Sequence, residues 1–133
     1  MNALLARTTL GAVVEEQGSG ITRLTIPAGA RGDYRLAQLD DYHQQARGDF
    51  LHRPPLQLAL EARVSASDLP GTWGFGLWND PFSLSLGLGG GARRLPALPQ
   101  AAWFFHGSAP NYLSFRDQQP AQGLLAGVFR SSP

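Results

Sequence analysis

Alternation of apolar and polar residues is clearest between Leu56 and Ser65. Five apolar side chains at every second position share one face, and polar side chains dominate the other. Because successive side chains of a strand point to opposite faces, this pattern predicts a β-strand with one buried face. Shorter stretches bounded by glycine, proline, asparagine or aspartate predict further strands. They are Thr72–Asn79, Ser83–Gly89, Ala102–Gly107, Tyr112–Arg116 and Leu124–Arg130.

The N-terminal third predicts one hairpin and one ambiguous segment. Val13–Gln17 and Ile21–Ile26 are two short candidate strands, joined by Gly18-Ser19-Gly20. Short glycine-rich connections of this kind are typical of β-hairpins. Tyr34–Tyr42 contains two leucines three residues apart, so it fits a helical turn as well as a strand. The polar stretch Asp40–Asp49 fits a loop or a short helix.

The close spacing of glycine and proline along the chain favours an all-β fold. Sixteen glycines and ten prolines recur at short intervals among 133 residues, which leaves room for short strands but not for long helices. About eight strands without a clear helix are typical of a sandwich or jelly roll. We therefore expect a single β-sandwich domain over residues 1–133, built of two antiparallel sheets. Because the chain is short for this architecture, it would be a shortened or truncated jelly roll.

The composition of the chain limits where the protein is expected to act and which partners it is expected to bind. The chain has no cysteine, which excludes disulfide scaffolds, thiolate zinc sites and cysteine nucleophiles. All eleven basic residues are arginine, the net charge is +1, and no basic run exceeds Arg93-Arg94, whereas nucleic-acid binding needs a clustered basic stripe. Met1–Leu10 lacks the features of a signal peptide, and no apolar stretch approaches the roughly 20 residues of a membrane helix. We expect a cytoplasmic protein that binds neither nucleic acid nor membranes.

The segment Gly71–Phe82 predicts an unusual strand. Three large apolar side chains between Trp73 and Leu77 share one face, the expected core side, while two glycines and Trp78 share the other. Each glycine costs roughly 0.5–1 kcal/mol relative to alanine inside an element, so two on one face need a reason. One reason is the close approach of a ligand or another chain. The other is room for a bulky side chain from a covering loop, such as Trp103 or Tyr112.

A ligand class follows from the residues expected around these glycines. If the turn at Asp80-Pro81 forms a hairpin, small residues of Ser83–Gly89 join this face, and polar residues of the Leu56–Ser65 strand border it. A sugar ring presents an apolar C–H face that stacks on tryptophan, and hydroxyls that bond polar side chains. We expect a saccharide-like ligand on the concave face, with Trp78 stacking on the ring. The predicted ligand-binding residues are Trp78, Glu61, Arg63, Gln57, Asp80, Trp103 and Tyr112.

A family resemblance points the same way. The runs Leu56–Ser65 and Gly71–Trp78 resemble paired strands of concanavalin A-like lectin and glucanase jelly rolls, in particular the laminarinase-type and laminin-G-like members. The resemblance implies a two-sheet sandwich with a concave face suited to carbohydrate. Two family motifs are missing. Glu61 stands alone where glucanases carry Glu-x-Asp-x-x-Glu, and His106 and Asn111 do not form the galectin motif His-x-Asn-Pro-Arg.

Catalytic and metal chemistry find little support in the residues. Glycoside hydrolysis needs two carboxylates about 5–5.5 Å apart or further, and only Glu61 and Asp80 are candidates. His43 and His52 lie near several aspartates, but they lack zinc-ligand spacing, and solvated loop residues are the simpler interpretation. No Gly-x-Ser-x-Gly elbow is present, and the glycine-rich run before Arg93 lacks the lysine of a phosphate loop. We expect no metal site and no cofactor.

Two alternative functions stay open beside non-catalytic saccharide binding. The run Trp103–His106 places aromatic side chains on both faces of one strand, which fits a central strand covered on both sides or an oligomer contact. The first alternative is therefore a structural or protein-interaction β-domain without a small-molecule ligand. A homo-oligomer would form through an exposed sheet edge. The second alternative is a glucanase-like glycoside hydrolase that lacks the usual motif.

Overall fold

The computed structural model describes residues 4–30, 32–81, 95–109 and 122–131. Within these residues the regular structure consists of seven β-strands and one 3-10 helix, with no α-helix. Every strand pair is antiparallel, and none of the sheets formed by these residues closes on itself. The expectation of an all-β fold with antiparallel sheets is confirmed. The described part of the chain holds no helix long and apolar enough to cross a membrane.

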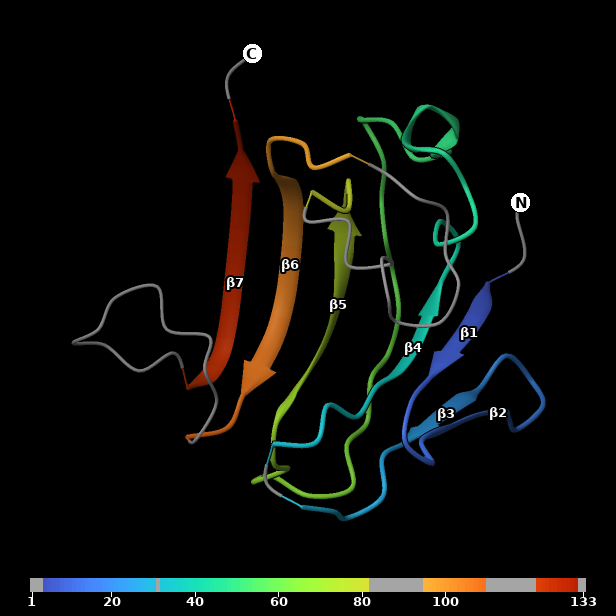
Figure 1. Ribbon diagram of the computed structural model, residues 1–133, viewed down its shortest axis with the longest axis vertical. Helices are drawn as coiled ribbons and strands as arrows, with labels where there is room; N and C mark the ends of the chain where they lie inside the picture. Colours follow the sequence, from blue (N-terminus) through green and yellow to red (C-terminus); the bar gives the residue numbers. More distant parts are fainter. Residues whose placement is uncertain (1–3, 31, 82–94, 110–121, 132–133) are drawn as a thin grey trace. The chain divides into compact units, whose positions relative to one another are not determined.

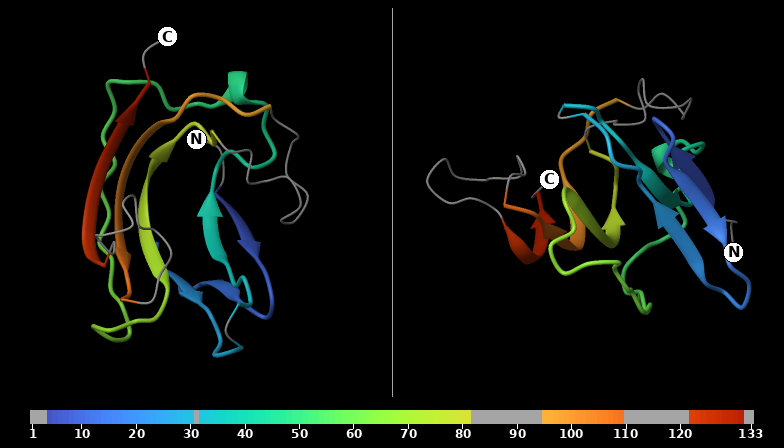
Figure 2. Two further views of the ribbon diagram at one scale, coloured as in Figure 1. Left: turned by 60° about the vertical axis from the view of Figure 1, so that its left-hand side comes forward. Right: turned by 90° about the horizontal axis from the view of Figure 1, so that it is seen from below.

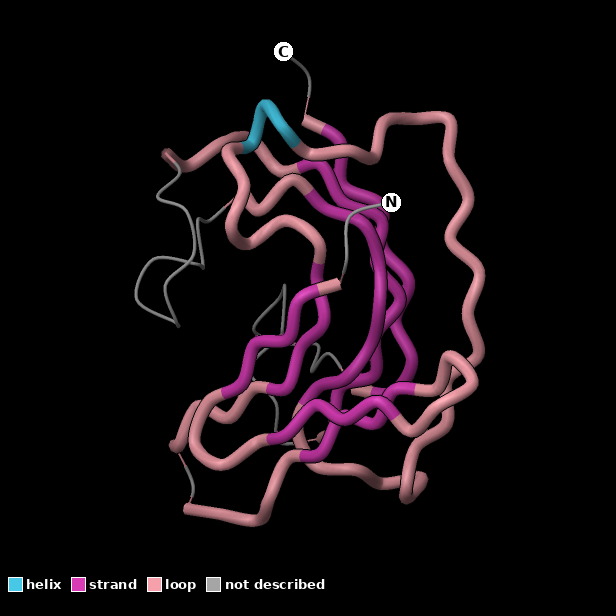
Figure 3. The backbone as a smooth tube through the Cα atoms, turned by 90° about the vertical axis from the view of Figure 1, so that its right-hand side faces the viewer, coloured by secondary structure: helices cyan, strands magenta, loops and turns pink. Residues whose placement is uncertain are grey.

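The described residues group into two compact units. The first unit contains residues 4–30 and 32–51, together with Leu95. The second contains residues 52–81, 96–109 and 122–131. The elements of the first unit are β1 (Leu5–Thr8), β2 (Val13–Glu16), β3 (Thr22–Thr25), β4 (Ala37–Asp40) and the 3-10 helix η1 (Arg47–Asp49), which Figure 3 colours cyan.

The predicted N-terminal hairpin is confirmed. Strands β2 and β3 pair antiparallel, with Val14 opposite Leu24. The turn forms because Gly18, Ser19 and Gly20 all adopt positive φ angles, between 52° and 79°, a region that glycine enters at little cost. The backbone N–H of Gln17 donates to the carbonyl of Ile21 at 2.8 Å and closes the turn.

The ambiguous segment around Leu36 is a strand rather than a helix. Strand β4 pairs antiparallel with β1, which the sequence analysis did not predict, and Arg7 lies opposite Gln38. Thr9 lengthens this pairing beyond β1. Its backbone N–H donates to the carbonyl of Leu36 at 3.0 Å, and its hydroxyl accepts from the N–H of Leu36 at 2.9 Å. Strand β1 pairs with the backbone N–H and C=O groups of β4. The segment is therefore a strand and not a helical turn, in which those groups would bond within the segment.

The second unit is built on a three-stranded antiparallel sheet of β5 (Thr72–Trp78), β6 (Gln100–Gly107) and β7 (Gly123–Arg130). All three strands were predicted, to within two residues at each end. Strand β6 lies between the other two, and the three curve together (Figures 1 and 2). The register places Phe104 opposite Phe75 on one side and opposite Ala126 on the other. This register fixes which side chains share a face.

The clearest strand prediction, Leu56–Ser65, is wrong. The segment has no strand assignment and appears as a plain trace in Figure 1 and as loop in Figure 3. Its alternation favours an extended chain, but a strand also needs a neighbour for its backbone groups, and no described strand pairs with it. Leu56, Leu58 and Leu60 are accordingly 39–47% exposed. The predicted strands Ser83–Gly89 and Tyr112–Arg116 lie outside the described residues, so the hairpin expected at Asp80-Pro81 does too.

Candidate functional site

The sheet of the second unit has two faces of different character. One is defined here as the open face, because four of its large side chains are exposed: Phe75 is 38% exposed, Phe104 50%, Leu124 79% and Val128 82%. The expectation that Trp73, Phe75 and Leu77 form a buried core is therefore wrong at Phe75, whereas Trp73 and Leu77 are half-buried. The register gives the open face the residues Trp73, Phe75, Leu77, Ala102, Phe104, His106, Leu124, Ala126 and Val128.

The opposite face, the glycine face, packs its aromatic residues beside glycine. It consists of Gly74, Gly76, Trp78, Ala101, Trp103, Phe105, Leu125, Gly127 and Phe129. A Cβ at Gly76 would lie 2.8 Å from Cδ1 of Trp103, and a Cβ at Gly74 would lie 2.6 Å from Cα of Phe105. Both positions would also meet a backbone carbonyl of β6. Gly76 thus leaves room for the side chain of Trp103 on the neighbouring strand, and Gly74 leaves room for the close approach of β6 at Phe104 and Phe105.

The two tryptophans predicted to bind ligand belong to this packed cluster. The rings of Trp78 and Trp103 lie 5.3 Å apart between centroids, and Trp103 also lies 5.9 Å from Phe129 and 6.2 Å from Phe105. Edge-to-face and tilted aromatic pairs at these distances stabilise a fold by roughly 0.5–1.5 kcal/mol each. Each tryptophan therefore has a packing role on the glycine face, and both remain partly exposed.

The three polar residues predicted to bond sugar hydroxyls lie on the segment that is not a strand. Gln57, Glu61 and Arg63 are all exposed. The prediction placed them on a strand that would border the glycine face, and that strand is not formed. The alternation along 56–65 predicted that these residues lie beside Trp78, whereas the sheet consists of β5, β6 and β7.

Asp80 and Tyr112 complete the predicted set. Asp80 follows β5 in a left-handed conformation with φ of 47° and is only 1% exposed, so the interpretation of Asn79-Asp80-Pro81 as a turn fits its backbone. The neighbouring Asn79 holds this end of the sheet. Its side-chain amide donates to the carbonyl of Leu98 at 2.9 Å, and its side-chain oxygen accepts from the N–H of Gln100 at 3.0 Å. Tyr112 lies outside the described residues.

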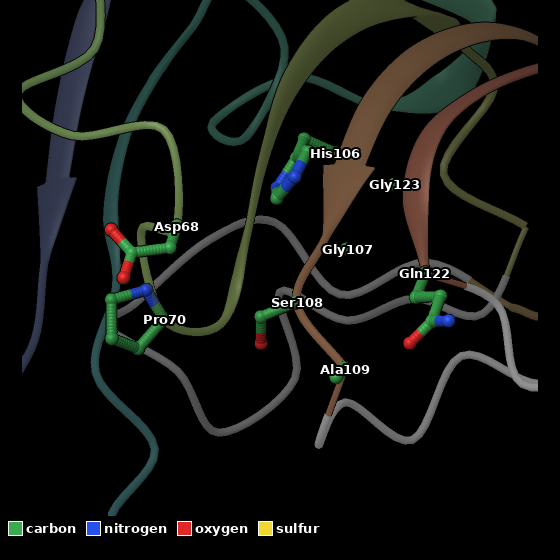
Figure 4. Close-up of a pocket in the computed structure, with 8 residues that line it drawn as sticks. All are labelled: Asp68, Pro70, His106, Gly107, Ser108, Ala109, Gln122 and Gly123. Atoms are coloured by element: carbon green, nitrogen blue, oxygen red, sulfur yellow. The ribbon is translucent and has the colours of Figure 1, made fainter.

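A pocket of about 620 Å³ opens at the other end of the sheet, where β6 ends and β7 begins (Figure 4). Its position is set by three chain segments: the loop before β5, the end of β6 with the two residues after it, and the start of β7. The N–H of Gly71 donates to Oγ of Ser108 at 2.9 Å and ties the first two of these segments together. The lining residues are Asp68, Pro70, His106, Gly107, Ser108, Ala109, Gln122 and Gly123.

His106 joins the pocket to the open face. Its imidazole stacks on the indole of Trp73, with centroids 5.7 Å apart and 20° between planes. The next pair along the strands, Phe75 and Phe104, stacks in the same way at 5.8 Å and 24°. Nδ1 of His106 is buried and has no hydrogen-bond partner among the described residues, and such an atom would be satisfied by a bound polar group. Two flat aromatic pairs therefore lead to a pocket with carboxylate, hydroxyl and amide side chains.

Of the two histidines expected to be solvated loop residues, His52 is exposed, as expected, but His43 is not. Asp40 and His43 are buried, and Nδ1 of His43 lies 2.8 Å from Oδ1 of Asp40. The same carboxylate accepts from the N–H groups of Tyr42 and His43 and from the side-chain amide of Gln38. These bonds fix the turn after β4. In the described ranges, no three His, Cys, Asp or Glu side chains form a metal-ligand group.

Sequence reasoning missed Asp68, Phe104, Ser108 and Gln122 as candidate site residues. The available signal was the aromatic content of Thr72–Asn79, where aromatic residues alternate with glycine, and of Ala102–Gly107, where three aromatic residues are consecutive. That signal becomes a surface only when the pairing and register of the two strands are known. Comparison with known proteins adds no further guide, because no protein-family model, no curated protein and no solved structure matches the chain.

Proposed function

We propose that this chain is a non-catalytic module that binds a saccharide-like ligand along the open face of the second unit. The observation that carries the proposal is the pair of stacked aromatic couples, Trp73 with His106 and Phe75 with Phe104, that leads to the polar pocket. Residues two apart on one strand face are roughly 7 Å apart. The two couples thus place aromatic side chains along roughly 7 Å of the open face, where a saccharide would contact them.

Saccharide chemistry matches both parts of this surface. The C–H face of a pyranose packs against aromatic rings, and Phe75 and Phe104 are 38% and 50% exposed. The hydroxyls need donors and acceptors, which Asp68, Ser108 and Gln122 provide in the pocket. A volume of about 620 Å³ lies within the roughly 300–1,000 Å³ typical of small-molecule sites. The proposal keeps the ligand class expected from the sequence and moves its contacts from Trp78 to the open face.

A second candidate function rests on the exposure of aliphatic residues on the same face. Leu124 and Val128 are 79% and 82% exposed. Sugar rings stack on aromatic side chains, so saccharide binding does not explain these exposed aliphatic side chains. Contiguous exposed apolar surface commonly marks a protein interface. A protein-interaction β-domain without a small-molecule ligand is therefore the competing proposal.

A glycan array followed by fluorescence titration tests the proposal. We expect binding to change the fluorescence of Trp73, so the Trp73→Phe variant should bind while losing most of the signal. Phe104→Ala and Asp68→Ala should each weaken binding about tenfold, the loss of roughly 1.4 kcal/mol. Trp78→Ala is the matched aromatic control from the glycine face and should keep its affinity within about twofold.

Two outcomes would overturn the proposal. Loss of binding in a folded Trp78→Ala variant, with Phe104→Ala unaffected, would assign the ligand to the glycine face. No binding to any glycan, from protein shown by circular dichroism to be folded, would reject saccharide binding and leave the interaction domain as the better proposal.

A further inference from the structure

Strand β7 presents an edge that no other described strand covers. It pairs with β6 along one side from Gly123 to Arg130. The strand order β5-β6-β7 places it at the end of the sheet, and no described residue pairs with its other side. Among the described residues, no strand therefore uses the outer backbone N–H and C=O groups of β7.

The sequence of β7 lacks the features that usually prevent strand addition. Natural edge strands are short or carry proline, a bulge or an inward-pointing charge. Strand β7 is eight residues long, contains no proline, and carries no charge before its last residue, Arg130. Its open-face residues Leu124 and Val128 are among the most exposed apolar side chains in the described residues.

We propose that a second copy of this chain docks antiparallel along the outer edge of β7, so that two three-stranded sheets become one of six strands. The charge pattern selects this occupant and this direction. An uncharged apolar strand is complementary to itself, as a two-fold interface requires. Parallel pairing would set the two Arg130 side chains beside each other, and like charges on neighbouring strands repel. Antiparallel pairing puts them at opposite ends.

The apolar pattern of the strand also restricts the register. Directly opposed residues share a face of the sheet, and a slip of one residue moves every side chain of a strand to the other face. Even-numbered residues from Leu124 to Val128 lie on the open face. We therefore expect even-numbered residues of one copy to oppose even-numbered residues of the other near Ala126, which joins the two open faces on the same side. This inference does not depend on whether the open face binds saccharide.

Sedimentation equilibrium of the full chain tests the proposal. The protein should form a species of twice its 14.3 kDa mass. Ala126→Lys and Ala126→Glu place like charges close across the two-fold axis, so each should raise the dimer dissociation constant about tenfold. An equal mixture of the two variants should restore dimers, because Lys then opposes Glu. Leu24→Lys, a matched exposed apolar residue on β3, should leave the dissociation constant unchanged.

Hydrogen exchange separates edge pairing from other contacts and needs no variant. Wild-type amides of β7 should become protected as protein concentration rises, since pairing adds backbone hydrogen bonds to the outer edge. A protein that is monomeric at every concentration would overturn the proposal. So would a dimer whose β7 amides gain no protection, because contact between open faces adds no hydrogen bonds to the strand. If both variants fail to fold, the exchange result alone decides.

Discussion

Trp103 and Phe104 are neighbours on β6, yet they lie on opposite faces and in opposite surroundings. On the glycine face, Trp103 packs against Trp78 and beside Gly76 of the adjacent strand. On the open face, Phe104 stacks on Phe75 and stays 50% exposed. The packed face is the one that carries the two glycines of β5, and at Gly76 the missing side chain leaves room for Trp103. An aromatic surface without such gaps remains available for a ligand or a partner.

The strongest test of this comparison fills a glycine gap. A Cβ at Gly76 would meet the carbonyl of Ala102 and Cδ1 of Trp103, so Gly76→Val should destabilise the protein by about 3 kcal/mol, at the upper end for overpacking. Valine also lowers the conformational entropy of the unfolded chain, which stabilises the folded state by less than about 1 kcal/mol and so offsets only part of this loss. Thermal and urea unfolding measure the change in the free energy of unfolding.

Gly48 supplies the matched control, because a Cβ there meets nothing within 4 Å. We expect Gly48→Ala to change the free energy of unfolding by no more than about 0.5 kcal/mol. If Gly76→Val were as mild as this control, the glycines would not be holding room for Trp103. The distinction between the two faces would then fail.

The next test removes one aromatic ring from each face. Fully buried tryptophan to alanine costs about 3–5 kcal/mol. Because Trp103 is only partly buried, we expect Trp103→Ala to cost about 2 kcal/mol. Phe104→Ala should cost less than about 1 kcal/mol, since half of its surface is already in water. Equal losses in chemical denaturation would show that the two faces contribute alike to the core.

Sequence reasoning succeeded where the signal was local. The hairpin β2–β3 needs only two short strands and a Gly-Ser-Gly turn, all within residues 13–26, and it formed as expected. Strands β5, β6 and β7 were also identified, from short stretches bounded by turn-forming residues. The segment Leu56–Ser65 shows the limit, because alternation describes how a chain spaces its side chains and not whether a neighbouring strand pairs with it. Strand β1 was missed because Arg7 interrupts its short apolar run.

The candidate site was harder to predict than the strands for the same reason. Gln57, Glu61 and Arg63 were grouped with Trp78 through an assumed pairing of Leu56–Ser65 with β5. The pairing of β5 is with β6, about thirty residues further along the chain. That pairing brings Phe75 to Phe104 and leads to Asp68 and Ser108. The saccharide-like ligand, the single domain, the cytoplasmic location and the concanavalin A-like resemblance stay predictions.

A smaller effect is expected at the end of the sheet, where neither face is involved. Asn79 donates to the carbonyl of Leu98 and accepts from the N–H of Gln100. Both bonds are partly open to solvent, so Asn79→Ala should cost about 1 kcal/mol, the usual net value of a hydrogen bond. This loss of stability is a reference against which the losses from Trp103→Ala and Phe104→Ala can be compared. A cost above that of Trp103→Ala would mean that the join between β5 and β6 stabilises the sheet more than packing on the glycine face.

The smallest stability effect is expected on the open face itself. Val128 is 82% exposed, and threonine has the same β-branched shape and a good strand propensity, so Val128→Thr should change the free energy of unfolding by less than about 0.5 kcal/mol. Its effect should instead fall on whatever the open face contacts. If the dimer forms through the backbone edge of β7, its dissociation constant should hardly change. If the open faces of two copies stack on each other, Val128→Thr should instead weaken association. If Val128 lies in a buried core, the variant should lower the free energy of unfolding by about 1–2 kcal/mol, because its hydroxyl would be buried without a partner.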